Sequence, residues 1–128
     1  MPKKAMETLT ESMYYVLMAF RLGPMCGIDV TEFVETWTEG RVQLGPATLY
    51  TILGKFEKEG YLREVSVEGR KRTYEITAKG LDAYKAEIDR LRLCAADAQR
   101  LETEEGRACL NSRKEEPSIA FHPALSTT

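Results

Sequence analysis

Two groups of side chains carry the binding chemistry that this chain can offer to a partner. Three cations follow one another at Arg70, Lys71 and Arg72. The second group lies between Gly45 and Gly60 at helical spacing: Ala47, Thr48, Thr51, Gly54, Lys55 and Lys58, with Tyr50 at its border. Hydroxyls and cations bind phosphate oxygens, and small side chains let a helix approach base edges closely. The two groups are therefore candidates for binding a polyanion; the alternative is a helix face that only meets water.

Charge is distributed unevenly along the chain. The net charge is −2, yet residues 41–79 contain eight Lys and Arg against five Asp and Glu, a local excess of +3. Residues 1–40 hold three basic and six acidic residues, and residues 80–128 hold seven and nine. Because the distribution of charge matters more than its sum, we expect the binding surface in the basic middle segment.

Residues for catalysis, metal binding or membrane insertion do not gather anywhere in the sequence. Cys26, Cys94 and Cys109 lack the spacing of a zinc site or a disulfide framework. The single histidine, His122, lies in a coil-forming tail. No nucleophile–base pair, phosphate-binding glycine loop, apolar run of membrane length or export signal is found. We therefore expect a cytoplasmic protein that is not an enzyme and needs no cofactor or metal.

Helix signals place the second group of candidate residues on a short helix. Pro46 suits its first turn, and Gly60 suits its C-terminal end. One face of this helix is expected to be buried, through Leu49, Ile52, Leu53 and Phe56. Two helices precede it, one starting near Thr8 and one running from an Asp29 cap to Gly40. The second and third helices are separated by a glycine-containing turn, which predicts a helix-turn-helix.

Strand signals follow the third helix. The segments Tyr61–Val67 and Arg72–Thr77 are rich in β-branched and aromatic residues, and a glycine-containing turn separates them. They predict an antiparallel hairpin with the three cations at its tip. The residues expected to anchor it inward are Leu62, Tyr74 and Ile76. The predicted fold class is mostly α with a small β-hairpin: a winged helix-turn-helix over residues 1–77.

A heptad pattern marks the last predicted helix, residues 78–104, which Thr77 would cap. Apolar residues step along it by three and four: Leu81, Tyr84, Ile88, Leu91, Ala95 and Ala98. This repeat is typical of two helices that pair, so we expect a homodimer held by this helix. The alternative is that the helix packs back on its own domain. Periodicity fails beyond Glu104, and residues 105–128 are expected to form a disordered tail.

In combination, these elements resemble the PadR family of bacterial winged-helix transcriptional regulators. The run ATLYTILGKFEKEGYL, residues 47–62, is similar to the family's recognition helix, and Arg72–Thr77 with Gly80 is similar to its wing-to-last-helix signature. Gly23 and Gly27 also fall where the family commonly has glycine. The resemblance covers roughly residues 8–100. It implies a homodimer that places one recognition helix per subunit in successive major grooves, and repression that a small molecule relieves.

The short last helix is similar to that of the family's smaller subclass, some of whose members bind flat aromatic drugs at the dimer interface. Candidates for such a site are Tyr14, Tyr15, Met18 and Trp37. They would line an apolar cleft between subunits or simply fill the interface. The expected DNA contacts are Ala47, Thr48, Tyr50, Thr51, Lys55, Arg70, Lys71 and Arg72. A winged-helix module that binds proteins without reading DNA stays as the alternative, and salt-dependent binding to duplex DNA distinguishes the two.

Overall fold

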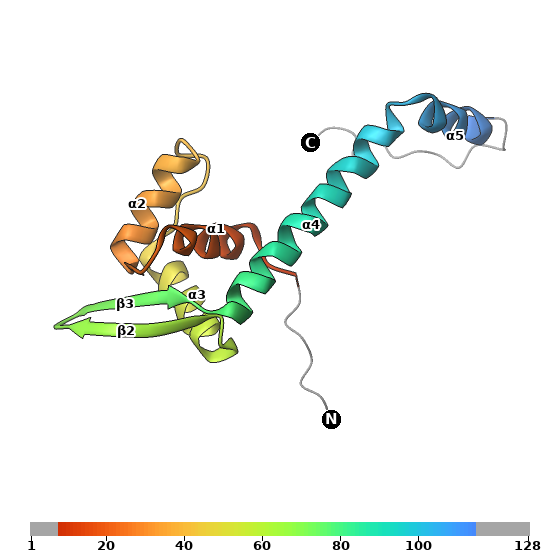
Figure 1. Cartoon of the computed structure of the whole chain (residues 1–128). Helices are drawn as coiled ribbons and strands as arrows, with labels where there is room; N and C mark the ends of the chain where they lie inside the picture. The colour runs from red at the N-terminus through yellow and green to blue at the C-terminus, as the bar shows by residue number, and fades with distance from the viewer. Residues whose placement is uncertain (1–7, 115–128) are drawn as a thin grey trace. The chain divides into compact units, whose positions relative to one another are not determined.

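The computed structural model describes residues 8–114. Its elements, in chain order, are α1 (Glu11–Ala19), the 3-10 helix η1 (Phe20–Leu22), β1 (Met25–Cys26), α2 (Gly27–Trp37), α3 (Pro46–Glu59), β2 (Leu62–Glu68), β3 (Lys71–Ile76), α4 (Ala78–Leu101) and α5 (Glu104–Lys114). The chain divides after Asp89 into two units, which we describe separately. In the first unit, α1, α2 and α3 gather beside a long hairpin of β2 and β3 (Figure 1). The predicted fold class is confirmed.

Helix α1 begins at a hydroxyl cap two residues after the predicted start. The Thr10 hydroxyl accepts a hydrogen bond from the Met13 amide at 3.2 Å, which satisfies one N–H group of the first turn. One face of α1 is buried in the core, through Met13, Val16, Leu17 and Ala19. Phe20, the first residue of η1, is also buried. These side chains form the centre on which α2 and α3 pack.

Helix α2 has Cys26, not Asp29, as its N-cap residue. The Asp29 carboxylate accepts hydrogen bonds from the Cys26 amide at 3.4 Å and from the Cys26 thiol at 3.3 Å. Asp29 therefore acts from inside the first turn, where a carboxylate also lies near the positive end of the helix dipole. The predicted cap position was wrong by three residues, because a reciprocal capping box places its acid at the third helical position.

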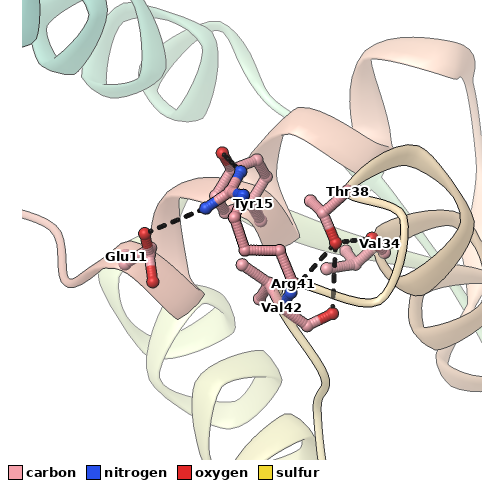
Figure 2. Close-up of polar contacts among 6 residues, drawn as sticks. All are labelled: Glu11, Tyr15, Val34, Thr38, Arg41 and Val42. Carbon is pink, nitrogen blue, oxygen red and sulfur yellow. Dashed lines mark hydrogen bonds and ion pairs between the residues drawn. The ribbon is translucent and has the colours of Figure 1, made fainter.

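The connector between α2 and α3 is built around one buried hydroxyl. Thr38 Oγ1 donates to the Val34 carbonyl at 2.7 Å and accepts from the Val42 amide at 3.0 Å (Figure 2). The Val34 carbonyl also accepts from the Thr38 amide at 3.0 Å, whereas the Val42 amide is buried and has the Thr38 hydroxyl as its acceptor. Because a buried N–H group needs a partner, the hydroxyl fixes the path of the connector. The connector in turn determines where α3 begins.

Helix α3 has the predicted bounds and the predicted buried stripe. Pro46 is its first residue, and Gly60 closes it in the left-handed conformation, with φ +80°. The buried residues are Leu49, Ile52, Leu53 and Phe56. The start of α2 lies close against this stripe, since a Cβ on Gly27 would be 3.2 Å from Leu49 Cδ2. The predicted helix-turn-helix is therefore α2 and α3.

The three strands form one antiparallel sheet in the order β1-β3-β2. Strands β2 and β3 are the predicted hairpin, called the wing from here on; Leu62 lies opposite Ile76, and a bulge separates Glu64 from Ser66. Leu62 and Tyr74 are buried as predicted, and Ile76 is partly buried. Strand β1 was not predicted. It is two residues long and becomes a strand only through its pairing with β3.

Helix α4 begins at its predicted cap. The Thr77 hydroxyl accepts from the Gly80 amide at 3.0 Å and donates to the Gly60 carbonyl at 2.6 Å. The first turn of α4 lies so close to the start of β2 that a Cβ on Gly80 would be 2.2 Å from the Tyr61 carbonyl oxygen. Only glycine allows this approach, so Gly80 fixes the first turn of α4 against the base of the wing.

Helix α5 corrects the expectation of a disordered tail from residue 105. Its first turn holds Glu104 and Glu105, which stabilise the positive end of the helix dipole. Gly106 is buried close against Leu101, the last residue of α4, which ends three residues earlier than predicted. With few apolar residues in α5, hydrophobic periodicity could not reveal it. The remaining predicted tail, residues 115–128 with His122, lies outside the described residues.

Candidate nucleic-acid interface

Helix α3 exposes the side opposite its buried stripe. Five predicted contact residues are exposed there: Ala47, Thr48, Tyr50, Thr51 and Lys55. The Thr51 hydroxyl donates to the Ala47 carbonyl at 2.9 Å, which leaves its oxygen able to accept from a partner. Beside this stripe, Tyr50, Gly54 and Glu57 recur at i, i+4 and i+7 and form a second stripe on α3.

The wing tip carries the three predicted cations on a tight turn. Gly69 adopts φ +64°, a left-handed conformation that the turn requires. Arg70, Lys71 and Arg72 are all exposed. The Arg72 guanidinium lies 3.6 Å from the Glu64 carboxylate across the hairpin, and this Glu64 oxygen is buried without a hydrogen-bond partner among residues 8–114. The ion pair therefore compensates a buried carboxylate oxygen and reduces the charge that Arg72 offers to a ligand.

A groove joins the second stripe of α3 to the wing. It has a volume of about 780 Å³, and its walls come from the start of α2, from α3 and from the wing. Tyr50 lines it together with all three wing cations. The structure therefore brings together four predicted residues from two separate segments. Ala47, Thr48, Thr51 and Lys55 do not line the groove and belong to the neighbouring stripe.

Sequence reasoning placed Gly54 on the exposed face of α3 but did not identify the other groove residues as part of a binding surface. Ile28 and Asp29 come from the first turn of α2, and Leu53 and Glu57 come from α3. Ile28 is 69% exposed, which is high for a large aliphatic side chain. It falls outside the apolar period of α2, and this irregularity is the one sequence signal that could have found the groove. The groove also contains two carboxylates, Asp29 and Glu57, in addition to the three wing cations.

The predicted effector residues make ring contacts in two groups. The Tyr14 ring lies 5.4 Å from that of Tyr15 and 5.5 Å from that of Tyr84 in α4, between centroids. Burial, followed by the neighbouring Tyr84, raises the pKa of Tyr14 above its usual value. Trp37 instead stacks on Phe33 at 5.7 Å and is 69% exposed. Trp37 therefore makes its ring contact within α2, not with the tyrosines of α1.

Tyr15 also ties α1 to the connector before α3. Arg41 donates to the Tyr15 hydroxyl at 2.8 Å and pairs with Glu11 at 3.5 Å (Figure 2). The hydrogen bond to Tyr15 raises the pKa of Arg41 further above its already high value. Met18, on the same helix, is half-buried. Both tyrosines thus have structural contacts inside the chain.

The predicted dimer seam is divided between the two units. Three members lie in the first unit and are partly buried: Leu81, Tyr84 and Ile88. Tyr84 packs against the core of its own chain. In the second unit, Leu91 is 39% exposed and Ala95 is also exposed, while Leu93, outside the seam, is 67% exposed. Of the predicted seam, the exposed residues are therefore on the part of α4 after Asp89.

Residues 8–114 contain neither a cluster of metal-ligating side chains nor a helix suited to crossing a membrane. No group of three or more His, Cys, Asp and Glu side chains there could hold a metal ion. None of the helices in this part of the chain is long and apolar enough to cross a membrane. Cys26, Cys94 and Cys109 are free thiols, and only Cys26 is buried.

Three helices, a wing and a groove between them define a winged-helix domain of the type found in transcriptional regulators. A family model, the transcriptional regulator PadR-like family, matches residues 16–86. The chain belongs to this family, and the resemblance inferred from residues 47–62 and 72–80 is confirmed. No curated protein sequence matches the chain.

Solved structures share this fold at low sequence identity. A transcriptional regulator from Clostridium thermocellum, Cth-833, aligns with a TM-score of 0.63 and 22% identity over 71% of this chain and 92% of that chain. A PadR family regulator from hypervirulent Clostridium difficile R20291 gives 0.60 and 11%, over 71% and 97%. BpsR of Bordetella bronchiseptica, whose DNA binding is regulated by 6-hydroxynicotinic acid, gives 0.56 and 16%, over 81% and 70%. At sequence identities this low, the structural matches show only that the fold is shared.

Proposed function

We propose that this protein is a homodimeric, cytoplasmic repressor that binds duplex DNA in a sequence-specific manner. The observation that supports this function is the meeting of the exposed face of α3 with the three cations of the wing along one groove. A duplex offers such a surface two targets, the major groove for the helix and the neighbouring backbone for the cations. Membership of a transcriptional regulator family supports the same function.

Helix α3 acts as the recognition helix. Its N-terminus and the exposed Thr48 hydroxyl meet phosphate, and the Tyr50 phenol donates to the backbone. Ala47, Thr51 and Lys55 reach base edges, since they share the outward stripe. Selection of bound sequences from a random duplex pool should return inverted repeats with half-sites about one helical turn apart. Half-sites without two-fold symmetry would contradict a dimer of this geometry.

The wing supplies phosphate contacts through Arg70, Lys71 and Arg72. Each neutralised phosphate contributes about −0.9 to the slope of log affinity against log salt concentration, so six contacts per dimer give roughly −5. Replacing the three cations by alanine should flatten this slope in fluorescence anisotropy titrations. The matched control replaces three exposed cations outside α3, the wing and the seam of α4, namely Arg21, Arg107 and Arg113, and should leave the slope unchanged. Equal slopes for wild type and wing variant would remove the wing from the interface.

Dimerisation uses the part of α4 that carries Leu91 and Ala95. Leu91→Asp should yield monomers in sedimentation experiments and weaken operator binding, because a charge cannot be buried unpaired in an apolar seam. Leu93→Asp, two residues away and outside the seam, is the control and should remain dimeric. The opposite result would place the interface on a different face of α4.

A small aromatic effector relieves repression in this proposal. BpsR, which shares the fold, has its DNA binding regulated by an aromatic acid. The effector residues proposed here remain Tyr14, Tyr15, Met18 and Trp37, and quenching of Trp37 fluorescence on adding planar aromatics would support them. Absence of salt-dependent duplex binding would instead favour a winged-helix module that binds proteins.

A further inference from the structure

The groove between α3 and the wing has the size of a small-molecule site. Its volume of about 780 Å³ falls in the range of about 300–1,000 Å³ that ligand pockets occupy. All of its lining residues lie in the first unit, so a single chain forms it completely. The groove shares no residue with the effector site proposed above, because Tyr14, Tyr15, Met18 and Trp37 do not line it.

One part of the groove is apolar and aromatic. Ile28 and Leu53 contribute aliphatic surface, and Tyr50 and Tyr74 contribute rings. The Tyr50 ring is 65% exposed in the free protein, so a planar ligand can cover surface that is otherwise in water. Such walls favour a flat apolar body.

The wing side of the groove is cationic. Arg70, Lys71 and Arg72 line it, and Arg72 is shared with Glu64 as described above. Two carboxylates also line the groove. Asp29, on α2, already accepts two hydrogen bonds from Cys26, and Glu57 comes from α3. Glu64 neutralises Arg72, whereas Arg70 and Lys71 form no ion pair within residues 8–114. The groove is therefore positive at the wing tip, and this end selects an anion over a cation of the same shape.

Gly54 keeps the groove open. It lies in the middle of α3, where glycine costs about 1 kcal/mol relative to alanine. No close packing requires it, because a Cβ at this position would meet nothing within 4 Å. What its missing side chain provides is free space along the groove wall, between Tyr50 and Glu57.

We propose that this groove binds a planar aromatic carboxylate or sulfonate, with its ring against Tyr50 and Ile28 and its anionic group towards Arg70 and Lys71. The proposal rests on the proposed function in one respect: since the groove lies on the DNA-binding side, the bound anion excludes the DNA backbone. Regulation at this site is therefore direct competition at the DNA-binding surface.

The test uses 2-naphthoate as the probe and 2-naphthalenemethanol as its uncharged counterpart, titrated into the full chain by isothermal calorimetry. Wild type should bind 2-naphthoate at one site per chain and bind the alcohol at least about tenfold more weakly. Gly54→Leu places a large side chain at the groove wall, where its Cβ meets nothing within 4 Å, and should weaken 2-naphthoate binding by at least about tenfold. Lys58→Leu, also exposed on α3 but outside the groove, is the matched control and should bind as wild type.

Three results would overturn the proposed site: no 2-naphthoate binding, equal affinity for the alcohol, or unchanged affinity in Gly54→Leu. A second titration separates this site from the proposed function. Labelled duplex is titrated with the wild-type chain at increasing 2-naphthoate, and the apparent DNA affinity should fall. If the wild-type chain does not bind duplex even without 2-naphthoate, the proposed function is contradicted but the ligand site is not. Duplex affinity unaffected by saturating 2-naphthoate would refute the competition.

Discussion

Gly80 and Gly54 are both helical glycines, yet their replacement by alanine should change stability in opposite directions. Alanine is the better helix former by up to about 1 kcal/mol in a helix interior. At Gly54, the added Cβ meets nothing within 4 Å, so Gly54→Ala should stabilise the protein by about 0.5–1 kcal/mol. At Gly80, the same Cβ would be 2.2 Å from the Tyr61 carbonyl oxygen and 2.9 Å from Ile76 Cγ1.

The clash at Gly80 involves backbone and cannot be relieved by a side-chain rotation. Overpacking of this kind costs about 1–3 kcal/mol. Moving the backbone of α4 to relieve the clash also strains the hydrogen bond from the Gly80 amide to the Thr77 hydroxyl, which measures 3.0 Å. Losing this N-terminal cap costs about 1 kcal/mol. The gain in helix propensity offsets part of this, so Gly80→Ala should lower the free energy of unfolding by about 1–3 kcal/mol.

Urea unfolding followed by far-UV circular dichroism measures both variants at one protein concentration, since the proposed dimerisation would make stability concentration-dependent. Gly54→Ala reports the helix-propensity term alone and serves as the control for Gly80→Ala. A Gly80→Ala protein as stable as wild type, or more stable, would refute the close approach of α4 to the base of the wing.

Three further variants test other contacts. Thr38→Val leaves the Val42 amide without its partner and should cost about 1–3 kcal/mol in urea unfolding, whereas Thr38→Ser should keep most of the stability. Glu64→Gln releases Arg72 from its ion pair and should tighten duplex binding at a fixed salt concentration; an unchanged duplex affinity would mean that Arg72 does not contact phosphate. Because the pKa of Tyr14 is raised in the folded state, its contribution to stability is present below about pH 10 and is lost as the pH rises through the folded pKa. Tyr14→Phe should therefore lessen the alkaline loss of stability in unfolding curves at about pH 9 and 11, and an identical alkaline loss in both proteins would contradict this.

Local sequence signals predicted most of the elements. Pro46 and Gly60 bound α3 because proline presets the first helical turn and glycine accepts the left-handed end. The cap at Thr77 and the strands on both sides of Gly69 follow the same logic. Each of these features depends on a few neighbouring residues, so sequence alone determined the helix-turn-helix, the wing and the start of α4.

Other features depend on residues that are distant in sequence. Strand β1 exists because β3 offers it hydrogen-bonding partners, and its two residues carry no periodicity of their own. Tyr84 falls on the heptad seam, yet it stacks on Tyr14 of its own chain. Helix α5 was missed because its stability comes from charge placement and a buried Gly106, not from an apolar face.

The candidate interface shows the same division. Sequence alone identified Tyr50 on one predicted helix and three cations on a predicted hairpin, because residue type and helical period are local properties. Only the tertiary structure decided that Tyr50, Gly54 and Glu57 face the wing, that Ile28 and Asp29 complete the groove, and that Arg72 is paired with Glu64. The physical reason is that a groove is formed by packing: its walls are set by which faces the core buries, and no short stretch of the chain contains that information.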